Sequence, residues 1–432
     1  MNRYPSYKPS GVKWLGEIPS HWRLVKSKYL WKESFATSEN GNEELLSVSQ
    51  YDGITPAKGD SRSESLKGYK IVSENDLVIN IMLAWMGGLG VSNYNGIVSP
   101  AYCIYKLNDD SNPKFLHYLY KTPLYLAEFA RHSTGVIPSR WRMYTDDFGQ
   151  VLSLIPPREE QDAIVSYLDE RTAKIDAAIA QQQKMIDLLN ERKQIIINRA
   201  VTKGLNPNAK MKDSGVEWIG EVPCHWECRK LKSICANTQY SIKTGPFGSQ
   251  LKGDDIQEFG DVPIYNQRVV IDNDCYLFNS YVSKAKADAL KSFVVKSKDL
   301  LITTRGTIGK STIVPNDALE GILHPCIIAI RLNFDLCWNE YLQFFFQSIA
   351  FNTDMTLKSN ATTIEVIYSY NLKECFVPIP PIDEQKHIVE YLNEELSKIN
   401  QTIAATTNQI SLLQERKQII INEVVTGKVK VV

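Results

Sequence analysis

Two stretches of the chain combine basic, aromatic and glycine residues in a pattern that suits nucleic acid. Residues 114–145 hold five Lys or Arg and one acid, and residues 284–310 hold seven against two. Such cations neutralise phosphates, and the forked guanidinium group of arginine can donate to guanine. A basic loop is more often simply solvated, so DNA contact needs further support. The candidate DNA-contacting residues are Arg140, Trp141, Arg142, Lys243, Gln250, Arg305 and Lys310.

Two glycine-containing runs are further loop candidates. Lys243–Gln250 reads KTGPFGSQ and supplies the predicted contacts Lys243 and Gln250, and residues 85–90 read WMGGLG. Glycines would let the backbone approach a ligand closely. Arg305–Ser311 resembles the end of a phosphate-binding loop, but Thr304 stands where the first glycine is required. We therefore predict no nucleotide site there.

The chain offers little for catalysis or metal binding. Seven of its eight cysteines lie in the second half, and Cys224, Cys228 and Cys235 form the only cluster. The matching positions of the first half hold Ser20 and Leu24, so a zinc site needed by a shared fold is not expected. His21 and His225 each precede a tryptophan, and we interpret both as packed structural histidines because no acidic partner is seen to recur with them. We predict no metal, no cofactor and no catalytic residue in this chain.

The elements that must position these residues are two near copies of one long segment. Residues 156–202 and 380–426 align without a gap at an offset of 224, and 26 of the 47 positions are identical. A shorter run, SGVKWLGEIPSHW from Ser10, returns as SGVEWIGEVPCHW from Ser214. The repeat therefore covers a whole half-chain, and the chain is a duplication.

Each copy of the long segment carries a heptad seam. Seven of ten seam positions in the first copy and eight of ten in the second are apolar, which favours a coiled coil over an ordinary surface helix. The apolar seam residues are Leu168, Ile175, Ile179, Ile186, Leu189, Ile196 and Ala200 in the first copy, with Leu392, Leu396, Ile399, Ile403, Ile410, Leu413, Ile420 and Val424 in the second. The two helices are expected to pair with each other. The isoleucine triplets at 195–197 and 419–421 predict a contact with another domain or protein.

Between the repeated ends lie two domains that have diverged. Short apolar runs at Asp76–Ile79 and Asp299–Ile302, and others from Gly96 and Gly321, predict strands. Aromatic and leucine residues at helical spacing predict one core-facing helix over 114–131 and another over 339–351. The two domains share a scaffold but differ in their surface residues, which suggests two modules that perform the same kind of task on different targets.

Composition places few limits on function. The 432 residues carry no formal net charge, and 43% are hydrophobic, which fits globular domains. No apolar run is long enough to cross a bilayer, and the first residues lack the apolar core of a signal peptide. The chain is expected to be soluble and cytoplasmic, with no membrane partner.

The hinge and helix motifs resemble those of one known family. Pro156-Pro157, Glu160-Gln161 and the run AVTKGL at 200–205 are similar to motifs of the specificity subunit of type I restriction–modification systems. The resemblance implies two target-recognition domains, each recognising half of a split DNA sequence. They would be spaced by two antiparallel helices that dock the methyltransferase subunits. S-adenosylmethionine, ATP and magnesium would belong to the methyltransferase and restriction subunits.

The predicted fold is α+β, with two mixed α/β domains separated by antiparallel coiled-coil helices and related by internal duplication. The expected domains are residues 1–155, 156–204, 205–379 and 380–432. The expected function is non-catalytic recognition of double-stranded DNA within a restriction–modification complex. A stand-alone nuclease or NTPase using Lys310, and a coiled-coil scaffold that binds only proteins, remain alternatives. At the positions of Arg140 and Arg142 the second half has Ile364 and Val366, so its DNA contacts must come from other residues.

Overall fold

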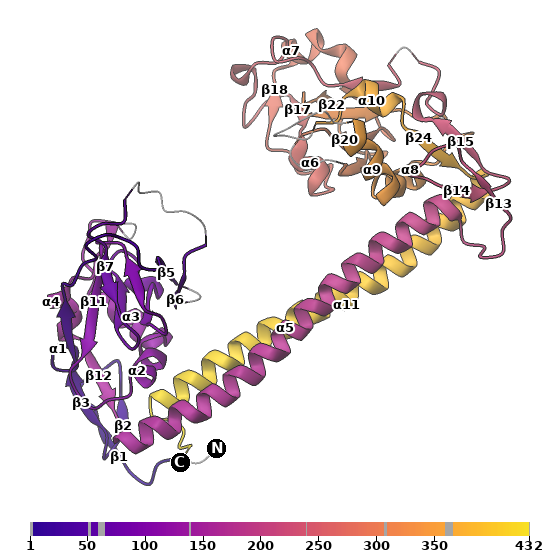
Figure 1. The fold of residues 1–432 in the computed structure, drawn as a ribbon. Coiled ribbons are helices and arrows are strands. Elements are labelled where there is room, and N and C mark those ends of the chain that lie inside the picture. The colour runs from indigo at the N-terminus through magenta and orange to yellow at the C-terminus, as the bar shows by residue number, and fades with distance from the viewer. Residues whose placement is uncertain are drawn as a thin grey trace. The chain divides into compact units, whose positions relative to one another are not determined.

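The computed structural model describes residues 3–50, 53–58, 65–137, 140–238, 240–305, 309–358 and 366–431. The chain divides into two compact units. Met1–Gln183 and Thr407–Val432 form the first, and Lys184–Thr406 forms the second. Each unit contains one mixed domain and parts of both long helices (Figure 1). None of the described helices is long and apolar enough to cross a membrane.

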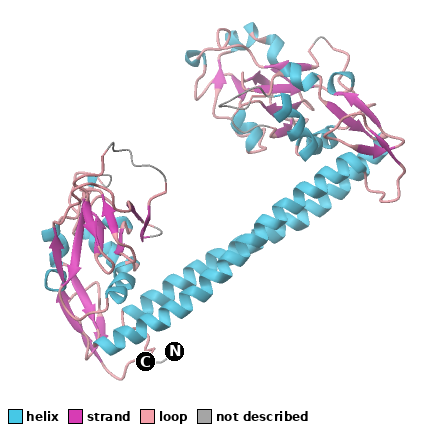
Figure 2. Cartoon of the chain, viewed as in Figure 1, coloured by secondary structure: helices cyan, strands magenta, loops and turns pink. Residues whose placement is uncertain are grey.

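The first mixed domain consists of short strands and short helices (Figure 2). Its strands are β1 (Tyr7–Pro9), β2 (Glu17–Pro19), β3 (Arg23–Lys26), β4 (Trp31–Ser34), β5 (Leu46–Ser49), β6 (Gly53–Pro56), β7 (Lys70–Val72), β8 (Leu77–Asn80), β9 (Leu89–Val91), β10 (Gly96–Val98), β11 (Tyr102–Leu107) and β12 (Leu152–Ile155). Its helices are α1 (Ser27–Leu30), α2 (Pro113–Tyr120), α3 (Pro123–Arg131) and α4 (Thr145–Gln150), with a 3-10 turn, η1, at Ala84–Met86.

The second mixed domain contains the same kinds of element and is longer. Its strands are β13 (Met211–Asp213), β14 (Glu221–Pro223), β15 (Glu227–Lys230), β16 (Ile242–Thr244), β17 (Val262–Tyr265), β18 (Tyr281–Val282), β19 (Val294–Val295), β20 (Leu300–Thr303), β21 (Ser311–Ile313), β22 (Gly321–Leu323), β23 (Ile327–Ile330) and β24 (Phe376–Ile379). Its helices are α6 (Gln267–Ile271), α7 (Lys284–Ala289), α8 (Asn339–Phe346), α9 (Ile349–Lys358) and α10 (Ser369–Lys373), with 3-10 turns η3 (Leu231–Ser233), η4 (Gly253–Asp255) and η5 (Lys291–Phe293). The long helices are α5 (Arg158–Lys203) and α11 (Ile382–Val425).

The sheets confirm the duplication. The first domain has the strand order β4-β11-β8-β9, and the second has β16-β23-β20-β21, all antiparallel. A two-stranded pair joins each domain to its helix: β3 with β12 in the first, and β15 with β24 in the second. The fold class is therefore α+β with two equivalent mixed domains, as predicted.

Each stretch that was predicted to form one core-facing helix forms two helices in the structure. α2 and α3 are separated because Pro123 has no N–H and begins a new helix, with Thr122 Oγ1 accepting from the amide of Tyr125 at 3.4 Å. α8 and α9 are likewise separate, and Ser348 Oγ accepts from the amide of Phe351 at 3.2 Å. The prediction of single helices over 114–131 and 339–351 was wrong because helical spacing of the apolar residues continues across both breaks.

Within each unit the two long helices pack antiparallel along the predicted seam. Between residues 401 and 419 of α11, the only side chains that are not exposed are those at seam positions, namely Ile403, Thr406, Ile410, Leu413 and Lys417. In the first unit Lys417 pairs with Asp176 at 2.7 Å, and in the second Lys193 donates to Asn400 at 2.7 Å. These pairs are equivalent through the offset of 224. In each pair the two residue numbers sum to 593, so α5 and α11 pair in the same register in both units.

The helix ends belong to the domain cores. Ile197, Ala200 and Val201 of α5 pack in the core of the second domain with Ile388 and Leu392 of α11. Ile421 and Val424 of α11 pack in the first domain with Ile164 and Leu168 of α5. The predicted domain contact of the isoleucine triplets is thus made by their second and third members, Ile196 and Ile197 in α5 and Ile420 and Ile421 in α11. The first members, Ile195 and Ile419, remain about half exposed.

A glutamate at the start of each long helix fixes the helix to its domain. Glu160 accepts hydrogen bonds from Tyr4 and from Trp22 Nε1, and bonds with His21 Nε2 at 2.8 Å. Glu384 repeats this arrangement with Trp226 Nε1 at 3.0 Å and His225 Nε2 at 2.8 Å. An acidic partner of the histidines therefore does recur, contrary to our expectation. It was missed because it lies 139 and 159 residues away in the chain.

The glutamine that follows completes this junction. Gln161 donates to Pro156 O at 2.9 Å and accepts from the amide of Asn112, just before α2. Gln385 donates to Pro380 O and Leu336 O, both at 2.9 Å, and accepts from the amide of Trp338, just before α8. The repeated Pro-Pro and Glu-Gln residues thus hold the first turn of each long helix against its own domain.

Candidate nucleic-acid interface

The predicted residues of the first domain meet on one surface. We call residues 81–88, 133–137 and 140–144 the first loop surface. The amide of Met143 donates to Ile81 O at 3.0 Å, and the rings of Trp85 and Trp141 meet edge to face at 5.3 Å. Arg142 forms an isolated antiparallel bridge with Thr134. The tryptophan–glycine run at 85–90 and the basic run at 140–142, which were separate predictions, therefore lie together.

Most cations of the first basic stretch are used within the protein. Lys114 pairs with Asp169 and Arg131 with Glu128, both at 2.6 Å. Lys121 donates to two backbone carbonyls. Arg142 Nη1 donates to the carbonyl of Trp141 at 2.8 Å. In the described ranges no hydrogen bond or ion pair engages the guanidinium of Arg140, which is exposed and free to meet a phosphate or a base.

The second domain has an equivalent surface with a hollow. We call residues 244–248, 304–305 and 366–370 the second loop surface. Together with Pro325 and Cys326 these residues line a cavity of about 400 Å³. The amide of Ile367 donates to Thr304 O at 2.9 Å, as Met143 does to Ile81. The bridging partners differ, because Arg142 pairs with Thr134, which follows α3, whereas Val366 pairs with Arg305, which follows β20. The two surfaces therefore share the contact of Met143 with Ile81 and of Ile367 with Thr304, but not the bridge.

Of the four predicted residues of the second domain, only Arg305 belongs to this surface. Arg305 lines the cavity and is exposed. Gln250 lies beside it, and its Oε1 accepts from the amide of Phe247 at 3.1 Å. The Lys243 ammonium lies over the rings of Tyr240 and Phe293, at 4.0 and 4.3 Å, and burial lowers its pKa. Lys310 is exposed, and its carbonyl accepts from the amide of Thr303 at 2.9 Å.

Two tyrosines escaped the sequence predictions. Tyr144 directly precedes α4 and Tyr368 directly precedes α10, and both are exposed on their loop surfaces. They are related by the offset of 224 that the long helices share, so this identity was a usable signal. Ile364, the counterpart of Arg140, lies outside the described residues.

The stretch that resembles a phosphate-binding loop has the wrong continuation. Such a loop leads into a helix whose N-terminal amides hold phosphate. Here Ser311 begins strand β21 instead. Gly306, Thr307 and Ile308 of this stretch lie outside the described residues.

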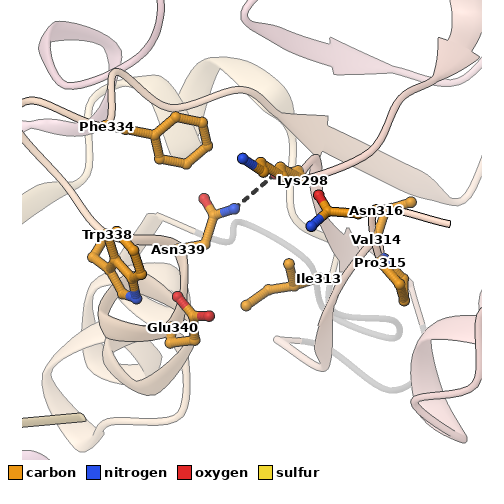
Figure 3. A pocket seen from close by; sticks show the side chains of 9 residues that line it. All are labelled: Lys298, Ile313, Val314, Pro315, Asn316, Phe334, Trp338, Asn339 and Glu340. Carbon is orange, nitrogen blue, oxygen red and sulfur yellow. Dashed lines mark hydrogen bonds between the residues drawn. The ribbon is translucent and has the colours of Figure 1, made fainter. Parts of the chain in front are cut away.

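A second hollow lies elsewhere in the second unit. It encloses about 520 Å³ and includes none of the predicted DNA contacts (Figure 3). Asn339 Nδ2 donates to Lys298 O at 2.8 Å there, and the Lys298 ammonium lies 5.7 Å from the ring of Phe334. Lys298, although part of the second basic stretch, therefore does not belong to the second loop surface.

No cluster of three or more His, Cys, Asp or Glu side chains suited to a metal ion occurs in the ranges that the structure describes. Of the cysteine cluster, Cys228 lies in β15 opposite Pro378, and Cys235 donates to Leu231 O. The site's chemistry is therefore that of exposed cations, aromatic rings and amides.

Comparison with known proteins agrees with this arrangement. Residues 223–412 match the family described as type I restriction modification DNA specificity domain. The structure shows that the first half repeats the fold of the matched half. A putative type I restriction enzyme MjaX specificity subunit from Methanocaldococcus jannaschii is 23% identical, over 96% of this chain and 96% of its own. The chain is therefore similar to type I specificity subunits along nearly its whole length.

Other specificity subunits support the same relationship. The type I restriction enzyme MjaVIII specificity subunit of M. jannaschii is 26% identical over 84% of this chain and 80% of its own. The HsdS subunit from Thermoanaerobacter tengcongensis has a similar fold, with a TM-score of 0.50 at 16% identity, covering 95% of this chain and 98% of that one. A chain from a type I R-M system, solved in a study of its complex assembly, has a TM-score of 0.69 at 15% identity, covering 94% and 98%.

Proposed function

We propose that this chain recognises a split sequence in double-stranded DNA, each mixed domain contacting one half. The observation that carries the proposal is that one strand order and one backbone contact between loops, kept in both domains, present unlike side chains. Arg140, Trp141 and Arg142 occupy the first loop surface, whereas Arg305 and Phe247 occupy the second, with Gln250 accepting from the amide of Phe247. A shared frame fits the regular DNA backbone, and different side chains suit different base edges.

The long helices supply a scaffold for partner subunits. Each unit has an apolar pair on its outer helix surface, and all four side chains are about half exposed. The pairs, which lie seven residues apart and correspond through the offset of 224, are Leu188 with Ile195 and Leu412 with Ile419. Two equal surfaces suit two copies of one partner. We assign them to methyltransferase subunits, with restriction subunits joining the same complex.

The chain's role in this proposal is recognition and assembly rather than catalysis. The relatives are named as specificity subunits of restriction enzymes. Methyl transfer, ATP hydrolysis and DNA cleavage would take place on the partner subunits. Because the DNA and these partners are found in the cytoplasm of a bacterial or archaeal cell, we place the chain there.

Methylome sequencing of a host with and without the chain, in the presence of its methyltransferase subunit, tests the proposal. The expected result is a split, asymmetric methylated motif that depends on the chain. If every methylated motif remains after the chain is removed, the proposal is contradicted. Cleavage of DNA or hydrolysis of ATP by the purified chain alone would favour a stand-alone enzyme. Binding of partner proteins without any DNA would favour the protein-only scaffold.

A further inference from the structure

The second loop surface exposes three aromatic side chains. Phe247 is 78% exposed, Tyr370 62% and Tyr368 48%. All three line the cavity that Arg305 also lines, and none of the described lining residues is acidic. Large apolar groups gathered at an exposed hollow mark an interaction surface.

The backbone beneath these side chains is fixed. The amide of Gly245 donates to Ile327 O at 3.1 Å, and a Cβ at this glycine would lie 2.1 Å from His324 O. Thr304 donates to Cys326 O through both its amide, at 3.0 Å, and its hydroxyl, at 2.9 Å. The aromatic side chains are thus presented from a buried frame, which lowers the entropy lost when they meet a ligand.

Tyr368 and Tyr370 form a stacked pair. Their ring centroids are 5.4 Å apart and their planes differ by 13°. Within the described part of the chain no hydrogen bond engages either hydroxyl. Through the offset of 224, Tyr368 corresponds to Tyr144 of the first domain, whereas Tyr370 corresponds to Asp146. One member of the pair is therefore shared between the domains and the other is not.

We propose that Phe247 and Tyr370 determine the specificity of the second domain by contacting base edges, and that Tyr368 and Tyr144 donate to phosphate oxygens. The proposal rests on the proposed function. Domains that recognise different half-sites must differ where they contact bases, but phosphates have the same geometry in every sequence. A phenyl ring suits the thymine methyl group, and a tyrosine hydroxyl suits either a base edge or a phosphate.

The base contacts are tested in the complex with the methyltransferase subunits, using duplexes that carry the motif found by methylome sequencing. Each position of each half-site is substituted in turn. Phe247→Ala and Tyr370→Ala should each lose discrimination at one position of the second half-site, by roughly 5- to 150-fold. Discrimination in the first half-site should not change. Phe259→Ala is the matched control, because Phe259 is 83% exposed in the same domain but does not line the cavity.

The phosphate contacts are tested with Tyr144→Phe and Tyr368→Phe, which remove only the hydroxyl. Both variants should weaken binding to all duplexes by the same factor. A change confined to one base position would overturn this assignment. If Phe247→Ala and Tyr370→Ala retain full discrimination while the wild-type complex prefers a split site, the inference fails and the proposed function stands. If the wild-type complex shows no sequence preference, the proposed function fails as well.

Discussion

At the scale of single residues, the structure separates cations that stabilise the protein from cations that remain available. Lys114 and Arg131 have carboxylate partners, whereas no described residue pairs with the guanidinium groups of Arg140 and Arg305. The sequence predicted where basic residues gather. It did not predict which of them are paired, because Asp169 is 55 residues from Lys114 in the chain.

Arg305→Ala distinguishes a base contact from a phosphate contact. If Arg305 donates two hydrogen bonds to a guanine, the variant should lose about 1 to 3 kcal/mol and tolerate other bases at one position of the motif. If it contacts a phosphate, binding should weaken on all sequences and the salt dependence should fall by about one charge. Titration of the complex with duplex DNA at several salt concentrations measures both. Unchanged binding under all conditions would remove Arg305 from the interface, and Arg140→Ala applies the same test to the first domain.

His117 should make the first domain sensitive to acid. Its Nδ1 accepts from the amide of Val91 at 3.1 Å, and burial, together with the charges of Lys121 and Lys114, lowers its pKa to about 4. The unfolded chain, with a histidine pKa near 6.5, binds more protons between these values. Above about pH 6.5 this histidine therefore does not reduce the free energy of unfolding, and below that pH the free energy of unfolding falls as the pH is lowered toward 4.

His117→Asn is the matched variant, because its side-chain oxygen can accept from the same amide but does not titrate. Urea unfolding of both proteins at neutral and mildly acidic pH should show a smaller loss in the variant. Equal losses in the two proteins would exclude His117 as the source.

At the scale of elements, periodicity was a sufficient guide to the long helices but not to their junctions. Apolar residues every three or four positions predicted the seam, because the pairing of two helices buries one stripe of each. The junction depends on Glu160 and Gln161 meeting Trp22 and Asn112, which lie far away in the chain. Such contacts follow from the folded domain and leave no periodic signal. The division of α2 from α3 had a signal in Pro123, which the aromatic pattern obscured.

Gln385 tests how much this junction contributes. Its side chain is fully buried and makes three hydrogen bonds, to the amide of Trp338 and to two carbonyls. Gln385→Met keeps the volume but leaves these groups unpaired, so we expect a loss of about 2 to 4 kcal/mol in the free energy of unfolding. Gln409→Met, at an exposed position of the same helix, should be nearly neutral. Urea unfolding measures both, and equal stability of the two variants would show that the junction is not held by these bonds.

At the scale of the whole molecule, duplication is the property from which most of the account follows. It was visible in the sequence because the helices and the Trp-containing entry segments kept their residues. The mixed domains have diverged in sequence but kept the strand order of one four-stranded sheet. The loop surfaces carry different residues, so the sequence indicated that they differ without indicating how the side chains of each are arranged.

Lengthening both long helices tests whether they set the spacing between the half-sites. One heptad inserted after Lys184 and another after Asn408 keep the seam and leave the Asp176–Lys417 and Lys193–Asn400 pairs intact. Each helix gains about 10 Å, and DNA rises 3.4 Å per base pair, so the spacer should grow by up to about 3 base pairs. The half-site sequences should not change. An active variant whose methylated motif has the original spacer would show that the helices do not set the distance.

The central claim is that the two mixed domains recognise their half-sites independently, and an exchange of one domain tests it most directly. Residues 23–155 should be replaced by the equivalent residues of another specificity subunit, because β3 pairs with β12 and the two strands must move together. The methylated motif of a host that carries the chimera and its methyltransferase subunit is then sequenced. We expect one half of the motif to become that of the donor, while the other half and the spacer stay as they were. A motif in which both halves change, or in which neither changes, would contradict the claim.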